Sequence, residues 1–115
     1  MLIPVVPVFR LRLRIGVLTL LDGVQMPTAS VLLHLAHRDP YPIIDYRALW
    51  SLGVDAPPTP YSFAFWEAYT RACRSLARAA NVSMRTLDRA LWQYSKERQA
   101  RLPSVAESAT DSGRR

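Results

Sequence analysis

The sequence predicts an all-α fold of about five helices. Apolar residues recur at three- and four-residue steps from Phe65 through Tyr69, Cys73 and Leu76, as they do on one face of a helix. Pro, Gly and small polar residues divide the chain into segments of helical length that are joined by short connections. The 115 residues, 50% of them apolar, are enough for one domain with one modest core.

The first segment of the chain, residues 1–14, is predicted to be an irregular or strand-like arm. From Phe9 to Ile15, apolar residues alternate with arginines, a period of two that suits a strand. Pro4 and Pro7 limit any regular element before it. Because a lone strand is unstable without a partner, two conformations stay open for this arm: an extended segment, or a helix formed against a partner.

No membrane-spanning or targeting segment is expected near the N-terminus. Arginines interrupt the apolar run before it reaches the roughly 18 residues that a membrane span needs. A secretory signal carries its positive charge before the apolar stretch, whereas here Arg10, Arg12 and Arg14 follow it.

Turn and capping residues predict where the helices begin and end. Gly23 suits the turn after a short first helix, and Pro27 suits the first turn of the second. The side chains expected to cap later helices are Asp45, Thr59 or Ser62, and Ser83. The expected helices cover residues 13–21, 27–37, 46–52, about 62–80 and 84–98, within a helical domain at 15–102. The tail, 103–115, is rich in Ser, Ala and acidic residues and is expected to be disordered.

Basic residues are concentrated toward the C-terminal end. The whole chain has a formal net charge of +6, and residues 61–102 hold eight basic residues against three acidic ones, which gives this stretch +5. Such a bias favours a polyanionic partner, nucleic acid before a membrane surface. A solubilising charged face has the same composition, so charge alone leaves both interpretations open. The basic residues are Arg71, Arg74, Arg78, Arg85, Arg89, Lys96, Arg98 and Arg101.

One cysteine and two histidines limit the redox and metal chemistry. Cys73 is the only thiol, so no internal disulfide forms, which suits a reducing cytoplasm. Its place among apolar helix positions predicts a buried core role. His34 and His37 are three residues apart on one expected helix without a third ligand nearby, so no metal site and no cofactor are expected.

Two short stretches carry the functional signal. In "LDGVQMP" a Gly-containing turn joins two expected helices, which leaves backbone N–H groups at the start of the second helix free to bind phosphate. An ordinary helical hairpin inside a core has the same pattern. About twenty residues later, "YPIIDYRALW" places one carboxylate, Asp45, at a helix N-cap.

Together, the stretch "LLDGVQMPTASVLLHLAHRDPYPIIDYRALWSLG" resembles the central region of the helix–hairpin–helix DNA glycosylases, most closely the bacterial proteins with the 8-oxoguanine DNA glycosylase fold. The later stretch "VSMRTLDRALWQYSKE", residues 82–97, is similar to the closing helix of that bacterial group. The resemblance covers roughly residues 15–97. It implies a glycosylase-like helical domain that removes a damaged base, 8-oxoguanine among the candidates, from double-stranded DNA.

The resemblance assigns roles residue by residue. Gly23 and Val24 match the hairpin. Asp45 matches the catalytic aspartate, which faces the deoxyribose of a flipped-out nucleotide and stabilises positive charge at C1′ or activates the nucleophile. Pro27 stands where the strand-cleaving subfamily has a Schiff-base lysine, so hydrolysis without lysine-dependent strand cleavage is expected. Gln25 replaces the second hairpin glycine at the expected phosphate contact.

Four further residues are candidates for contacts with DNA. Arg47, two residues after the expected catalytic group, suits either a phosphate or a carboxylate partner. Gln93 and Lys96 lie one helical step apart on the last expected helix, where they reach a cleft or a phosphate, or form an exposed polar face. Trp92 is a candidate for a pocket wall. Core packing is the alternative for all three tryptophans: Trp50, Trp66 and Trp92.

Three functions are therefore open. The first is a DNA glycosylase, the second is a non-catalytic DNA-binding remnant of the same fold, and the third is a small helical interaction module whose apolar N-terminal segment is a partner surface. Glycosylases of this fold carry much of a second subdomain before the hairpin, where this chain has only about twenty residues. A truncated copy, a mispredicted start and half of an assembly are therefore all open, and in the last two cases a missing N-terminal half or a partner chain would supply the absent wall of the pocket. The oligomeric state is not predicted.

Overall fold

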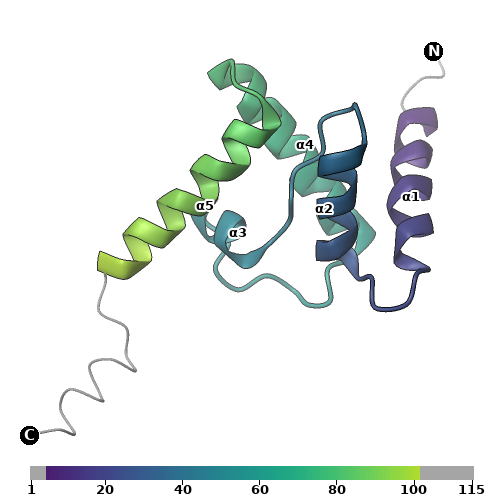
Figure 1. The fold of residues 1–115 in the computed structure, drawn as a ribbon, viewed down its shortest axis with the longest axis horizontal. Coiled ribbons are helices and arrows are strands. Elements are labelled where there is room, and N and C mark those ends of the chain that lie inside the picture. Colours follow the sequence, from purple (N-terminus) through teal and green to yellow (C-terminus); the bar gives the residue numbers. More distant parts are fainter. Residues whose placement is uncertain (1–4, 102–115) are drawn as a thin grey trace, which may run out of the picture.

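The computed structural model describes residues 5–101, and over this range every regular element is an α-helix. The helices are α1 (Val5–Thr19), α2 (Met26–Ala36), α3 (Tyr46–Ser51), α4 (Phe63–Ala80) and α5 (Met84–Arg101). In Figure 1, α1 and α2 stand side by side, α4 runs behind α2, and α3 lies against α5. The all-α prediction is confirmed. None of the helices in this range is both long enough and apolar enough to cross a bilayer.

The predicted strand-like arm is wrong for residues 5–14, which belong to α1. Leu11, Ile15 and Leu18 recur at helical spacing on the side of α1 that packs into the core beside α2, and Ile15 is buried there. Pro7 lies in the first turn, where a backbone N–H has no helical partner to lose. Residues 1–4 of the arm and the expected tail, 103–115, lie outside the described residues.

The outer face of α1 is apolar and exposed, which explains the misleading alternation in the sequence. Phe9, Leu13 and Val17 form a second apolar row at four-residue steps, and each is more than half exposed. Because this row lies roughly opposite the buried one, apolar residues fall at every second position while the segment stays helical. The apolar row continues into the turn after α1, where Leu20 is 82% exposed. The interaction-module hypothesis depends on this surface.

Side-chain caps begin the later helices where the sequence predicts them. Asp45 Oδ1 accepts a hydrogen bond from the Ala48 N–H at 2.8 Å, and Ser83 Oγ accepts one from the Thr86 N–H at 3.1 Å. Between these two helices, α4 ends at Asn81, whose φ of 55° is left-handed, a conformation that asparagine tolerates better than most residues. These caps are local features of the sequence, and the predicted starts of the four later helices hold to within one or two residues, whereas α1 begins eight residues before its predicted start at residue 13.

Ser62, rather than Thr59, caps α4, because its Oγ accepts a hydrogen bond from the Phe65 N–H at 3.1 Å. We expect Ser62→Ala to lower the free energy of unfolding by about 1 kcal/mol, since it leaves one helix N–H without its cap. Urea unfolding followed by circular dichroism measures the change. Ser75→Ala, at an exposed position inside α4, is the matched control and should not destabilise the protein. Equal losses from both variants would contradict the capping role.

The core lies between α2, α4 and the segment that follows α2. Trp66 of α4 is fully buried and stacks on Tyr41, with ring centroids 5.9 Å apart. Arg14 of α1 donates a hydrogen bond of 2.8 Å to the Tyr41 hydroxyl and so connects α1 to this core. Cys73 is buried, as predicted, and burial raises the pKa of its thiol to about 12, which keeps it protonated and unreactive.

The predicted inner faces of α4 and α5 are only partly right. Leu76 and Tyr94 are exposed although the apolar stripes include them, and Ser95 is fully buried although it is polar. Leu76 is 41% exposed, and Tyr94 is 47% exposed although its ring lies 6.1 Å from the Trp50 ring. Trp50 is half-buried and Trp92 is 40% exposed, so Trp66 is the one tryptophan whose core role is confirmed.

Candidate functional site

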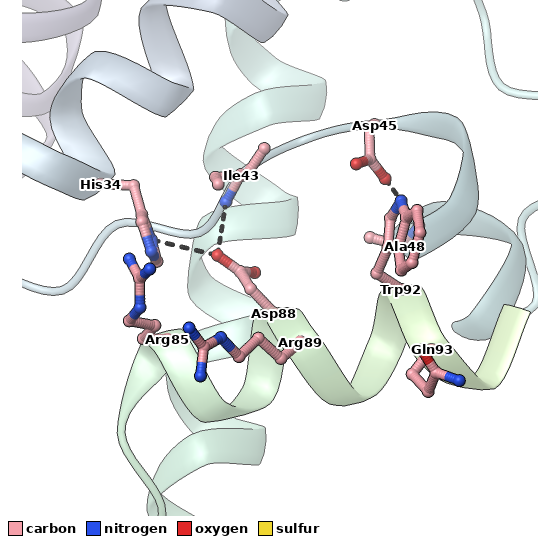
Figure 2. Close-up of a pocket in the computed structure, with 9 residues that line it drawn as sticks. All are labelled: His34, Ile43, Asp45, Ala48, Arg85, Asp88, Arg89, Trp92 and Gln93. Carbon is pink, nitrogen blue, oxygen red and sulfur yellow. Dashed lines mark hydrogen bonds and ion pairs between the residues drawn. The ribbon is translucent and has the colours of Figure 1, made fainter. Parts of the chain in front are cut away.

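A pocket of about 510 Å³ lies where the end of α2, the segment before α3, and α5 meet. Its polar lining residues are His34, Asp45, Arg85, Asp88, Arg89 and Gln93. Ile43, Ala48 and Trp92 supply the apolar part of the wall. Figure 2 shows that residues from α5 form one side of this pocket, while Asp45 approaches from the chain just before α3.

Three of the residues predicted from the sequence meet at this pocket: Asp45, Trp92 and Gln93. Asp45 is the N-cap of α3, with extended backbone angles of φ −150° and ψ 169°, and its Oδ1 is occupied by the Ala48 N–H. Its second carboxylate oxygen points away from α3 (Figure 2). The cap therefore fixes the side chain and leaves one oxygen available to a ligand.

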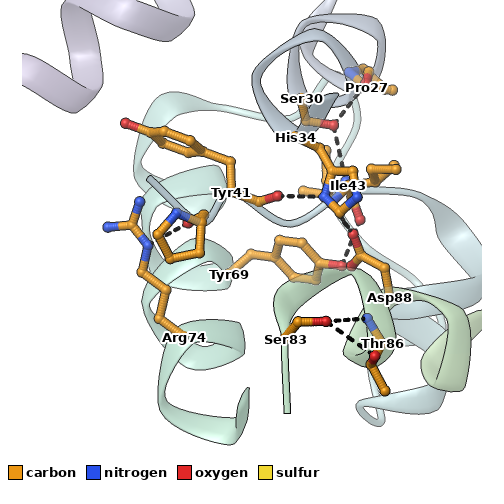
Figure 3. Close-up of polar contacts among 12 residues, drawn as sticks. Pro27, Ser30, His34, Tyr41, Ile43, Tyr69, Arg74, Ser83, Thr86 and Asp88 are labelled. Carbon is orange, nitrogen blue, oxygen red and sulfur yellow. Dashed lines mark hydrogen bonds and ion pairs between the residues drawn. The ribbon is translucent and has the colours of Figure 1, made fainter. Parts of the chain in front are cut away.

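The short segment that carries Asp45 is held by hydrogen bonds from three helices. The Ile44 N–H donates to Ser30 Oγ of α2 at 3.0 Å, and the Tyr69 hydroxyl of α4 donates to the Ile43 carbonyl at 2.7 Å. Burial raises the pKa of Tyr69, so this hydroxyl keeps the proton that it donates. The Ile43 N–H donates to Asp88 of α5 at 3.1 Å. Figure 3 shows these contacts around the segment. Because they come from α2, α4 and α5, the position of Asp45 depends on how these three helices pack.

Trp92 forms an aromatic surface between two cations. The Arg47 guanidinium carbon is 5.3 Å from the ring centroid, and the Lys96 ammonium nitrogen is 5.1 Å from it. Both distances suit cation–π attraction. The structure therefore brings Arg47 and Lys96 together at the edge of the pocket, through a ring that each contacts separately.

The remaining contacts of Arg47 and Gln93 bear on the alternatives that the sequence left open for them. Arg47 Nη1 lies 3.5 Å from Gln99 Oε1, and among the described residues Arg47 has no carboxylate partner. Gln93 Nε2 donates to Glu97 Oε1 at 2.9 Å while the residue lines the pocket. The Arg47 guanidinium therefore contacts the Gln99 amide and the rings of Tyr46 and Trp92. Because no carboxylate of the described residues pairs with it, it can bind an anion.

The expected hairpin is present but lies away from the pocket. Gly23 has a left-handed φ of 77°, and the Val24 N–H donates to the Leu21 carbonyl at 3.1 Å, which closes the turn. Gln25 is the N-cap residue of α2, and its side chain makes no capping hydrogen bond. These three residues stand at the start of α2, whereas His34 lines the pocket near the end of the same helix, about 12 Å farther along at 1.5 Å per residue.

Sequence reasoning did not assign four of the polar pocket residues to a site: His34, Arg85, Asp88 and Arg89. A signal for most of them was present. One face of α5 carries pocket residues that are spaced three or four positions apart. They are Arg85, Asp88, Arg89, Trp92 and Gln93. That face is polar, and searches for apolar stripes pass over it. The sequence presents His34 only as a possible metal ligand, and among the residues that the structure describes no group of three His, Cys, Asp or Glu side chains could bind a metal ion.

No match to this chain is found among protein-family models, curated proteins or solved structures.

Proposed function

We propose that this chain is a DNA glycosylase-like protein that hydrolyses the N-glycosidic bond of a damaged base, with Asp45 as the catalytic carboxylate. The observation that supports this most is the fixed position of Asp45 at a pocket that also holds an exposed tryptophan and two arginines. The pocket volume of about 510 Å³ is within the range of small-molecule sites, roughly 300–1,000 Å³.

In this proposal a damaged nucleotide leaves the duplex and its base enters the pocket. As the bond between C1′ and the base nitrogen breaks, the bonding electrons leave with the base, and Asp45 stabilises the positive charge on the sugar. The oxygen of a water molecule then bonds to C1′, and the proton that this water loses balances the proton taken up by the departing base. Trp92 offers a face for stacking, and Arg85 and Arg89 bind backbone phosphates.

The product is an abasic site in an uncut strand. Pro27 lies in the first turn of α2, at the position that corresponds in the proposed family to the lysine of the strand-cleaving enzymes, and proline has no amine that could form a Schiff base. The protein is therefore expected to act as a hydrolase only.

The test uses duplexes that each contain one 8-oxoguanine, uracil or alkylated base. Strand breaks should appear with one of these substrates, and only after treatment with alkali. Borohydride should trap no covalent complex between protein and DNA. If no substrate yields abasic sites above the level of a protein-free reaction, the catalytic proposal fails for this set of bases.

A non-catalytic duplex-binding protein is the second candidate, and the cations around the pocket favour it. Arg47 and Lys96 flank Trp92, and Arg85 and Arg89 line the pocket itself. These side chains neutralise phosphates whether or not a bond is cleaved. Binding without turnover would support this function over the first.

Both functions predict salt-dependent binding of duplex DNA through the α5 arginines. We expect the double variant Arg85→Ala and Arg89→Ala to reduce the slope of log affinity against log salt by about 1.8, since each lost phosphate contact removes about 0.9. Fluorescence anisotropy with a labelled duplex at several salt concentrations measures this slope. Arg71→Ala is the control, because Arg71 pairs with Glu67 on α4 at 2.8 Å and does not line the pocket. An unchanged slope in the double variant would exclude these arginines from the DNA interface.

A further inference from the structure

A buried pair of titratable side chains lies directly behind the segment that presents Asp45. His34 Nδ1 of α2 is 3.0 Å from Asp88 Oδ2 of α5, and the two side chains are only 6% and 10% exposed. Each of them also contacts the backbone of this segment. His34 Nδ1 lies 2.8 Å from the Tyr41 carbonyl oxygen, and Asp88 Oδ2 accepts the Ile43 N–H at 3.1 Å (Figures 2 and 3).

The contacts determine where the protons lie. A carbonyl oxygen only accepts hydrogen bonds, so His34 must carry a proton on Nδ1 and donate it toward Tyr41. Asp88 Oδ2 accepts the hydrogen bond of the Ile43 N–H, and it lies 3.0 Å from the same His34 nitrogen. Asp88 Oδ1 is buried and has no hydrogen-bond partner among the described residues. When Asp88 takes up a proton, Oδ1 is therefore the oxygen that receives it.

The surroundings make the charge of Asp88 sensitive to pH. Burial raises the pKa of Asp88 to about 6, against the opposing effects of the Ile43 N–H and of His34. Asp45, from the segment before α3, raises it further, and Arg85 and Arg89 line the same pocket from α5 itself. From α4, Tyr69 and Cys73 face Asp88, and burial raises the pKa of both, so both are neutral at physiological pH.

We propose that His34 and Asp88 are positioning residues that together fix the Tyr41–Asp45 segment and so place Asp45 at the pocket. They connect α2 and α5 to backbone atoms of residues two and four positions before Asp45. Both side chains are largely buried, at 6% and 10% exposed, so water has little access to either contact while the segment stays in place. The role of Asp45 in this statement rests on the proposed function, whereas the structural role of the pair does not.

The pH dependence of this arrangement has a definite sign. With the segment closed, the pKa of Asp88 is near 6, and opening admits water and returns it toward the ordinary value of 3.8. The closed form therefore binds the proton more tightly than the open form. Closure is most stable at low pH and loses stability as the pH rises through about 6. From these two values the opening equilibrium should increase about tenfold between pH 5 and pH 7.

Amide hydrogen exchange of Ile43 tests the pair without any assay of catalysis. In the wild-type protein, protection of this amide relative to the unfolded chain should fall about tenfold from pH 5 to pH 7. Asp88→Asn keeps an oxygen that can accept the Ile43 N–H but does not titrate, so its profile should be flat. Asp55→Asn, at an exposed position, is the matched control and should keep the wild-type profile. A flat wild-type profile, or the same fall in Asp88→Asn, would overturn the role of Asp88.

His34→Gln tests the coupling between the two side chains. His34 lowers the pKa of Asp88, so its removal should move the fall in protection to higher pH. An unmoved profile would show that the two groups act separately and would overturn the pair.

The link to Asp45 is tested by excision kinetics. Asp88→Ala removes the acceptor for the Ile43 N–H, so it should lower the single-turnover excision rate about tenfold while duplex affinity stays within about twofold. Asp88→Asn should restore most of that rate. Equal loss of rate in the Asn and Ala variants would overturn the positioning role. If the wild-type protein excises no base, the proposed function fails, and the exchange profiles still decide whether the pair holds the segment.

Discussion

Asp45→Asn is expected to lower the rate of base excision by about 10²- to 10³-fold, the range found when one preorganised electrostatic group is removed from an active site. The substitution removes the charge and little else. Asparagine is as good an N-cap as aspartate, and its amide oxygen can accept the Ala48 N–H as Asp45 Oδ1 does at 2.8 Å. Single-turnover reactions with a damaged duplex measure the rate.

Two controls make this result specific to Asp45. Asp55→Asn makes the same chemical change at an exposed position and should leave the rate unchanged. Affinity for the duplex should not fall in Asp45→Asn, because loss of a negative charge near the phosphates does not weaken their attraction to the α5 arginines. A wild-type rate in Asp45→Asn would show that Asp45 is a cap without a catalytic role.

The position of Asp45 could be predicted because an N-cap is a local feature. Asp45 and Ala48 are three residues apart, and the hydrogen bond between them needs no information from the rest of the chain. The same holds for Ser62, Ser83 and the left-handed Asn81.

Arm residues 5–14 were predicted wrongly because apolar residues lie on two opposite faces of one helix. Only the packing of Ile15 beside α2 identifies the inner one.

The candidate site was only partly predictable for a related reason. Trp92 and Gln93 could be placed on one helix with the sequence alone, and the pocket includes both. The contact between His34 and Asp88 joins α2 to α5. No periodicity in the sequence between these residues predicts that the two helices meet there. A buried contact between two titratable side chains depends on which helices meet, so it can be identified only when the fold is known.

Trp66→Ala should destabilise the fold more than any other single change considered above, by about 3–5 kcal/mol. Trp66 is fully buried, stacks on Tyr41 at 5.9 Å and lies 6.0 Å from the Phe63 ring. Alanine would leave a large cavity at the point where α4 meets the segment before α3. Because small domains are stable by only about 5–15 kcal/mol, a large share of the protein should unfold in low concentrations of urea.

Trp92→Ala provides the matched comparison, since it removes the same side chain from a position that is 40% exposed. It should cost less than about 1.5 kcal/mol of stability, because much of its ring already faces water. It should nevertheless weaken duplex binding, through loss of the stacking surface between Arg47 and Lys96. Urea unfolding and fluorescence anisotropy on both variants separate the two roles. If Trp92→Ala destabilised the protein as much as Trp66→Ala, Trp92 would be a core residue and the pocket would lose its aromatic wall as a binding surface.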